Sequence, residues 1–290
     1  MEISLHIGAH LTDDDKLFSC LRRNGPLLAQ QGIAVPDPGR YRQQLQKLSA
    51  EMQGKITDAQ TQEALLDGVL EADDVDRVVF SIENLMAIHD WILADGQFYP
   101  HAGPRIAGIR HLFPTAEFHV YLAIRNPASF LPALAYDKRA GGVDGSLKGV
   151  NPASVRWSSV IARIKEAAPD VQITVWCDED TALLWPEILR AVAGHTPETQ
   201  LDGWFAWYWD LIAPKSHEAM RRYFANNPIS DDAHRRRVLS VMLEKFARDE
   251  AQEVEASLPG WTDDYVEILT EIYEQDLDLI ASMPGVTLLE

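Results

Sequence analysis

The stretch EISLHIGAHLTDDDKLF, residues 2–18, decides the fold of this 290-residue chain. It starts as a short apolar run of strand length, turns at Gly8 and continues with the apolar spacing of a helix. Many phosphate-binding loops have the same parts, because the start of a helix offers unpaired backbone N–H groups to an anion. Where such a loop would hold a phosphate, this chain has Asp13, Asp14 and Asp15.

Strand-like and helix-like segments alternate through the first two thirds of the chain. Further strands are predicted at 77–82, 117–124 and 172–177, and helices at 16–31, 43–53, 58–70, 105–113 and 152–168. This alternation predicts an α/β fold, a parallel sheet flanked by helices.

After about residue 180 the pattern becomes almost wholly helical. Helices are predicted at 182–193, 238–253 and 263–280, the last with Thr262 as its N-cap. We therefore expect a single domain over 1–290, with an α/β body at 1–180 and a mostly helical C-terminal part at 181–290.

Composition and charge narrow the partners that this chain would bind. A net charge of −18 argues against binding to nucleic acid or anionic membranes. A small anionic ligand is still a possible partner where arginines converge.

The two cysteines lack CxxC spacing, so neither a zinc site nor a disulfide framework is expected. The absence of a basic leader and of a membrane-length apolar run predicts a cytoplasmic location. Whether the chain forms a homo-oligomer is left open.

Two motifs resemble those of bacterial sulfotransferase-like proteins. LHIGAH, followed by Thr12, is similar to the family's loop H-I-G-x-H-K-T-G-T-T, and LAIRNPASFLPA (122–133) is similar to its strand that ends in Arg-Asn/Asp-Pro. FSIENL, VWCDED and LPGWTDDY extend the likeness over most of the chain. The resemblance implies a P-loop-like fold and 3′-phosphoadenosine 5′-phosphosulfate (PAPS) as the donor of a sulfuryl group to a hydroxyl or amine.

The resemblance also implies where the donor would bind. The matching donor-site residues are Gly8, His10, Thr12 and Arg125. In the family, a loop lysine and the following amides hold the 5′-phosphosulfate, and the arginine with a serine eight residues later holds the 3′-phosphate. Here the lysine position is Leu11, the Gly-Thr-Thr positions are Asp13–Asp15, and the serine position is Ala133. Most side-chain contacts to the donor are therefore missing.

Carboxylates in the first turn of a helix satisfy the same electrostatics as a bound phosphate, at about 0.3–1 kcal/mol each. Thr12 is the expected cap, and Thr12 with Asp15 approximates a capping box. A carboxylate within ~4 Å of a phosphate charge would cost about 4 kcal/mol at an effective dielectric of 20. The sequence, with this resemblance, thus predicts a sulfotransferase-like protein that is inactive with PAPS and acts as a binding or scaffolding protein or on an unknown ligand. The alternative is an active PAPS-dependent sulfotransferase.

Glu83 and His10 are the candidate catalytic residues. Glu83 follows a predicted strand at the carboxyl edge, where a general base could face an acceptor hydroxyl; a plain capping role is the other reading. His10 with Asp13–Asp15 could bind a divalent metal, although adjacent helical side chains diverge by about 100°, which favours a capped helix start. Arg125 is expected either to hold an anion or to pair with one of the aspartates.

The C-terminal part contains one cluster of basic residues and one cluster of aromatic residues. HRRR, at 234–237, is expected to form a helix face paired with carboxylates. WFAWYWDLI, at 204–212, is expected in the core, with a ligand groove or dimer contact as the alternative.

Overall fold

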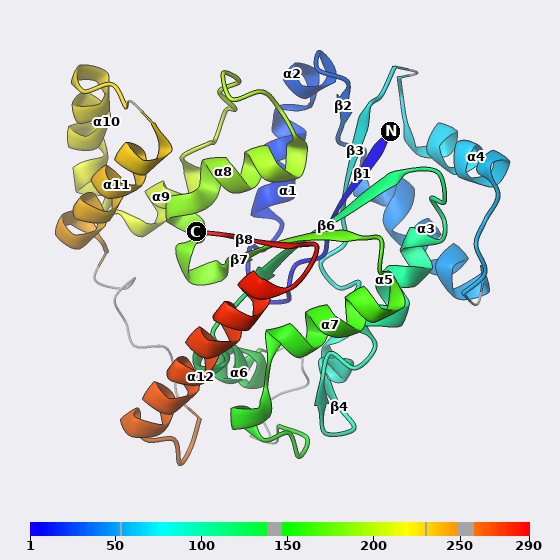
Figure 1. The fold of residues 1–290 in the computed structure, drawn as a ribbon. Coiled ribbons are helices and arrows are strands. Elements are labelled where there is room, and N and C mark those ends of the chain that lie inside the picture. The colour runs from blue at the N-terminus through cyan, green and yellow to red at the C-terminus, as the bar shows by residue number, and fades with distance from the viewer. Residues whose placement is uncertain (53, 73, 138–146, 230, 249–257) are drawn as a thin grey trace.

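The computed structural model describes residues 1–52, 54–72, 74–137, 147–229, 231–248 and 258–290. At its centre is a six-stranded sheet in the order β2-β3-β1-β6-β7-β8, in which every neighbouring pair is parallel (Figure 1). The strands are β1 (Glu2–His6), β2 (Ile33–Ala34), β3 (Arg77–Ser81), β6 (Glu117–Ile124), β7 (Gln172–Cys177) and β8 (Val286–Leu289). The predicted α/β fold with a parallel sheet is confirmed.

Helices cover both faces of the sheet, so that its central strands are buried on both sides. Ile3 and Leu5 of β1 join a core to which six helices contribute: α3 (Pro38–Met52), α4 (Ala59–Val69), α5 (Ala102–Arg110), α6 (Pro127–Tyr136), α7 (Trp157–Ala167) and α12 (Asp263–Ser282). Val79 and Tyr121 join a second core with α1 (Lys16–Arg23), α2 (Gly25–Ala29) and α8 (Thr181–Ala193).

The C-terminal part is mostly helical but also returns to the sheet. Three helices, α9 (Ala206–Leu211), α10 (His217–Asn226) and α11 (Asp232–Phe246), surround a third core that includes Phe205, Tyr208 and Ile212. The expected core role of the aromatic stretch is therefore confirmed at these residues. β8, which the sequence pattern did not indicate, adds a partly exposed edge strand beside β7.

Several predicted helices have different limits in the structure. The helix expected over 16–31 is two helices, because Gly25 and Pro26 start a new helix after Asn24 and proline cannot donate a backbone hydrogen bond. The helix expected at 238–253 begins at Asp232 and ends at Phe246, and residues 249–253 lie outside the described residues. A small antiparallel hairpin, β4 (Leu93–Ala94) and β5 (Gln97–Phe98), was not predicted.

All strands of the sheet point the same way, so the segments that follow β1, β3, β6 and β7 meet at one edge. In open α/β sheets this carboxyl edge is where ligands bind. Across the described ranges, no helix is long and apolar enough to cross a membrane.

Candidate functional site

The loop after β1 continues the ladder with β6 before it leaves the sheet. The amides of Ile7 and Ala9 donate to carbonyl oxygens of β6 at 3.0 and 2.9 Å. Gly8 has a φ of 89°, and a Cβ at this position would meet the Glu83 carbonyl oxygen at 3.0 Å. Only glycine combines this left-handed backbone with so close an approach. The loop is therefore pressed against the segment that follows β3.

The loop then contains three non-glycine residues in the left-handed region. Leu11, Asp14 and Asp15 have φ values of 60°, 47° and 61°. Each is a conformation that a residue with a Cβ adopts at a cost of about 1–3 kcal/mol, and it persists where the surrounding contacts hold it. At Asp15 the backbone amide donates to Glu83, and at Leu11 the carbonyl oxygen accepts from Arg125.

The first turn of α1 is capped by Asp13 rather than by Thr12. Helix α1 begins only at Lys16, and the Thr12 hydroxyl donates to the Ala9 carbonyl oxygen at 2.8 Å. The predicted Thr12 cap and its capping box with Asp15 are wrong, because the left-handed residues delay the helix start. Instead, Asp13 Oδ2 accepts from the Leu17 amide at 3.0 Å. An aspartate therefore does satisfy the start of this helix, as its electrostatics predicted.

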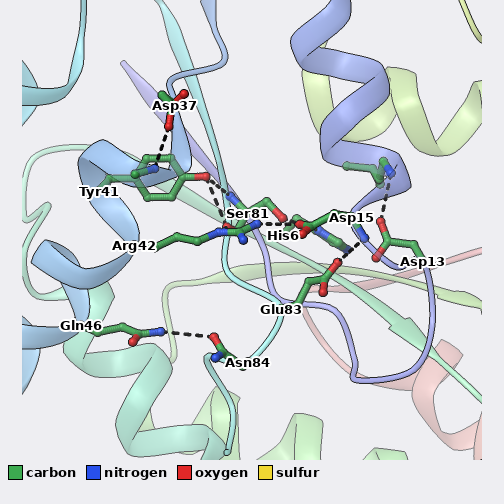
Figure 2. A network of polar contacts seen from close by, with 12 residues as sticks. His6, Asp13, Asp15, Asp37, Tyr41, Arg42, Gln46, Ser81, Glu83 and Asn84 are labelled. Carbon is green, nitrogen blue, oxygen red and sulfur yellow. Dashed lines mark hydrogen bonds and ion pairs between the residues drawn. The ribbon is translucent and has the colours of Figure 1, made fainter. Parts of the chain in front are cut away.

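Glu83 supplies a second carboxyl group to the same loop. Its Oε1 accepts from the Asp15 amide at 2.7 Å (Figure 2). Its side chain also hydrogen-bonds that of Asp13. Asp13 is 3% exposed, and no N–H group among the described residues donates to its buried Oδ1. Two carboxyl groups in contact need a proton between them, since both are otherwise acceptors only.

Burial and the hydrogen bond with Asp13 raise the pKa of Glu83 to about 8, and burial also raises the pKa of Asp13. The pair therefore holds one shared proton at neutral pH. A carboxyl group that keeps its proton at pH 7 is a donor rather than a general base. The geometry thus gives Glu83 a role in holding the loop.

Arg42, from α3, balances the remaining charge of the loop. Its Nη2 is 2.7 Å from Asp15 Oδ1, and its Nε donates to the Ser81 carbonyl oxygen at 2.7 Å. Below this pair, His6 is fully buried with its Nδ1 3.1 Å from Ser81 Oγ, and burial lowers the pKa of His6 to about 4. The imidazole is therefore neutral, and Arg42 is the cation that holds Asp15 (Figure 2).

Arg125 links the loop to α6. Its Nη1 donates to the Leu11 carbonyl oxygen at 3.1 Å, and its Nε donates to Ser129 Oγ at 3.0 Å. Ser129, four residues after the arginine, is a hydroxyl partner that the motif comparison at Ala133 missed. Arg125 therefore has structural contacts to both the loop and α6.

The start of α6 also meets a carboxylate of the chain. Glu179, which follows β7, accepts from the Asn126 amide at 2.7 Å through its Oε1. Asn126 is the N-cap of α6 and accepts from the Ala128 amide at 2.9 Å. Burial raises the pKa of Glu179, and the charge of Arg125 opposes that rise. The sequence did not single out Glu179, because 53 residues separate it from its partner.

His10 is part of the loop and lies at the edge of an open cleft of about 540 Å³. Its Nδ1 is 2.9 Å from the Tyr99 hydroxyl, and its ring centroid is 5.1 Å from that of His89, which pairs with Asp137 at 2.9 Å. The cleft is lined by His10, Leu11, Asp14, Arg42, Gln43, Gln46, Glu83, Asn84, Ile88 and His89. Of the predicted site residues, the structure thus brings His10 and Glu83 to one cleft.

The metal alternative needs His10 and the aspartates to converge. Among the residues that the structure describes, no three histidine, cysteine, aspartate or glutamate side chains are grouped so as to hold a metal ion. Asp13 faces Leu17 and Glu83, while Asp15 faces Arg42. Asp13 and Asp15 therefore serve different partners.

Comparison with known proteins does not assign this chain to a family. No protein-family model, curated protein or solved structure matches the chain. The site must therefore be interpreted from its own contacts: two helix starts that meet carboxyl groups of the chain, next to a polar cleft.

Proposed function

We propose that this chain is a sulfotransferase-like protein whose donor loop is filled by its own carboxyl groups, so that it does not bind PAPS and acts as a binding or scaffolding protein. One observation carries this proposal. The amides of Leu17 and Asp15, in the loop that the resemblance assigns to the donor phosphate, already donate to Asp13 and Glu83. An anion would have to displace both carboxyl groups to reach them.

The second phosphate position supports the same conclusion. The resemblance assigns the 3′-phosphate to Arg125, and Glu179 lies within the field of that guanidinium while it accepts the Asn126 amide. A phosphate there would compete with a carboxylate that is tied to the helix start. At about 4 kcal/mol per close pair of like charges at an effective dielectric of 20, each such carboxylate would weaken donor binding by about a thousandfold.

The cleft beside the loop is the surface that remains for binding. Its walls carry two imidazoles and the side-chain amides of Gln43, Gln46 and Asn84, all of which can exchange hydrogen bonds with a polar partner. Arg42 is held by Asp15 and Ser81, so the cleft presents little free positive charge. It therefore suits a neutral polar partner better than a nucleotide.

Calorimetric titration with adenosine 3′,5′-bisphosphate, the desulfated donor product, tests the proposal. We expect no binding by the native chain and binding by a variant with the loop restored to the motif: Leu11→Lys, Asp13→Gly, Asp14→Thr and Asp15→Thr. Micromolar binding by the native chain that is lost in Arg125→Ala would overturn the proposal and indicate a working sulfotransferase.

A further inference from the structure

Helix α12 carries large side chains on two of its faces. It packs against α6 and α7 (Figure 1), and its inner face holds Leu269, Tyr273 and Ile280, none of them more than 5% exposed. A second row of side chains repeats along the helix at alternating steps of three and four residues: Tyr265, Ile268, Ile272, Gln275 and Leu279. We call the four apolar members of this row the α12 seam.

The α12 seam is open to solvent. Ile268 is 48% exposed and Leu279 is 57% exposed, while Tyr265 and Ile272 are half-buried. Steps of three and four residues place side chains on one side of a helix, which is the spacing that one helix presents to another in a coiled coil. Single exposed apolar residues are common on protein surfaces, but a row of them is typical of a surface that another protein covers.

A row of carboxylates runs beside the seam. Asp264, Glu271 and Asp278 each precede a seam residue, so they recur every seven residues along one side of it, and all three are exposed. Glu267 and Glu274 add two more exposed carboxylates to the same helix. Helix α12 contains no lysine or arginine. The seam is therefore bordered by negative charge alone within its own helix.

The neighbouring helices do not neutralise the row formed by residues 264, 271 and 278. Helix α6 contains neither lysine nor arginine. In α7, Arg163 donates to the Phe98 carbonyl oxygen, and Lys165 Nζ donates to two carbonyl oxygens, those of Pro169 and Val171, at 3.0 and 2.6 Å. Within the described part of the chain, none of the three carboxylates forms an ion pair. The seam therefore suits a partner that is apolar at its centre and cationic along one edge.

A second copy of the chain does not have these properties. It carries the same net charge of −18, and two paired seams would bring their carboxylate rows together. The expectation that HRRR, at 234–237, forms a helix face paired with carboxylates is confirmed at two positions. Arg235 pairs with Asp232 at 2.5 Å and with Glu187, and Arg236 Nε is 3.7 Å from Glu187. These two guanidinium groups are already engaged within the chain.

We propose that the α12 seam docks an amphipathic helix of another protein, whose apolar side chains repeat with the same spacing and whose lysines or arginines face Asp264, Glu271 and Asp278. The apolar side chains supply the contact, and the opposite charges fix the register and favour this partner over an acidic one. Four apolar side chains make a small interface, so micromolar affinity is expected. The seam docks its partner whether or not the donor loop binds PAPS.

Three labelled peptides of about three heptads each test this docking. The basic peptide has leucine at the three–four spacing and lysine at the flanking positions. The acidic peptide has glutamate in place of lysine, and the scrambled peptide has the composition of the basic one without its spacing. We expect fluorescence anisotropy at about 0.15 M salt, which screens long-range attraction, to show micromolar binding of the basic peptide. The other two peptides should bind more weakly by about tenfold or more.

Replacing the apolar side chains locates the binding on α12. Ile268→Gln with Leu279→Gln should weaken binding of the basic peptide by about tenfold or more, because both side chains lose their apolar contact. Ile56→Gln with Leu27→Gln is the matched control, since these residues are 63% and 36% exposed and lie outside α12. Equal weakening by the two pairs of substitutions would overturn the proposal.

Reversing the charges tests the choice of partner. Glu271→Lys with Asp278→Lys should transfer the preference from the basic to the acidic peptide. Glu63→Lys with Asp67→Lys makes the same change of charge at exposed positions of α4 and should leave the preference as it is. A preference that the α12 substitutions do not alter would overturn the proposal.

Two further results would contradict a basic helix as the partner. One is the absence of binding by the basic peptide at millimolar concentration, or equal binding of all three peptides. The other is a dimer of the native chain in sedimentation that Ile268→Gln with Leu279→Gln dissociates, because a second copy would then cover the seam.

Discussion

Helices α1 and α6 begin at the same edge of the sheet, and each meets a carboxyl group of the chain itself. At α1 this group is Glu83, which is buried against a second carboxyl group, Asp13. At α6 it is Glu179, which lies in the field of Arg125. The two sites therefore differ in what balances the negative charge: a shared proton at α1 and a guanidinium at α6.

A carboxyl group that accepts the backbone amides at a helix start can therefore be stabilised in two ways, and each way makes the stability of the fold depend on a different change. A helix start accepts any well-placed anion, whether it comes from a ligand or from the chain. A proton, however, is lost as the pH rises, whereas an arginine keeps its charge throughout the usual range. The α1 site should respond to pH, and the α6 site should respond mainly to removal of its cation.

Glu83→Gln should have the largest effect. The pKa of Glu83 is about 8 in the folded chain and 4.5 in its ordinary, solvated state, so the folded state holds a proton that the unfolded state has lost. Stability from this group is full below about pH 4.5 and falls until about pH 8, by on the order of 5 kcal/mol. Glutamine keeps both hydrogen bonds without titrating, and urea unfolding should show Glu83→Gln more stable than the native chain at pH 8 and equal near pH 4.5.

Glu179→Gln is the matched variant at α6. Its pKa is also raised by burial, but Arg125 opposes that rise, so its effect on the pH dependence should be clearly smaller than that of Glu83→Gln. Parallel stability–pH curves for the native chain and Glu83→Gln would contradict the shared proton.

Gly8→Ala should come next in size. An added Cβ would meet the Glu83 carbonyl oxygen at 3.0 Å with φ at 89°, so both strain and a close contact oppose it. We expect a loss of about 2–3 kcal/mol of unfolding free energy. Gly96→Ala has a similar φ of 71° but nothing within 4 Å, and it should lose about 1 kcal/mol. Equal losses in chemical denaturation would mean that the loop is not pressed against the segment after β3.

Arg125→Ala should have a moderate effect, confined to stability. It removes the donors to Leu11 and Ser129 and the charge that faces Glu179, which together should lower the unfolding free energy by about 1–2 kcal/mol. Arg42→Ala removes a partly exposed pair with Asp15 and one donor to the Ser81 carbonyl oxygen, which keeps the Tyr41 hydroxyl as a donor at 3.2 Å. It should lose about 0.5–1 kcal/mol. If Arg42→Ala lowers the unfolding free energy more than Arg125→Ala does, the prediction that Arg125 contributes more to stability is wrong.

Thr12→Val should have the smallest effect. As a helix cap, Thr12 would contribute about 1 kcal/mol, but its hydroxyl donates to Ala9 and not to the start of α1. We expect a change within about 0.5 kcal/mol and unchanged helicity by circular dichroism. A loss above about 1 kcal/mol would restore the capping role that the sequence predicted.

The central strands could be predicted because their signal is local. Glu117–Ile124 and Gln172–Cys177 were predicted with the limits that the structure shows, since continuous apolar runs bounded by turns are typical of buried parallel strands. Thr262 was likewise identified as the N-cap of α12, and its Oγ1 accepts from the Tyr265 amide at 3.2 Å. β8 was missed because its four residues follow a long helix and are partly exposed.

The candidate site was only partly predictable, because its contacts join distant segments. The positions of Glu83 and Arg125 at strand ends follow from the motifs. Arg42 and Glu179 do not, since 27 and 53 residues separate them from their partners and no spacing rule connects them. The left-handed backbone at Asp14 and Asp15 was also invisible in the sequence, and it moved the start of α1 to Lys16.

The most direct test of the central claim observes the amides of Asp15 and Leu17 themselves. An NMR titration of the native chain at pH 7 with adenosine 3′,5′-bisphosphate would follow both signals. Because Glu83 and Asp13 already accept these amides, we predict that neither signal shifts at millimolar nucleotide. Saturable shifts of both signals at micromolar nucleotide would contradict the account, because they would show that an external anion takes the place of the chain's own carboxyl groups.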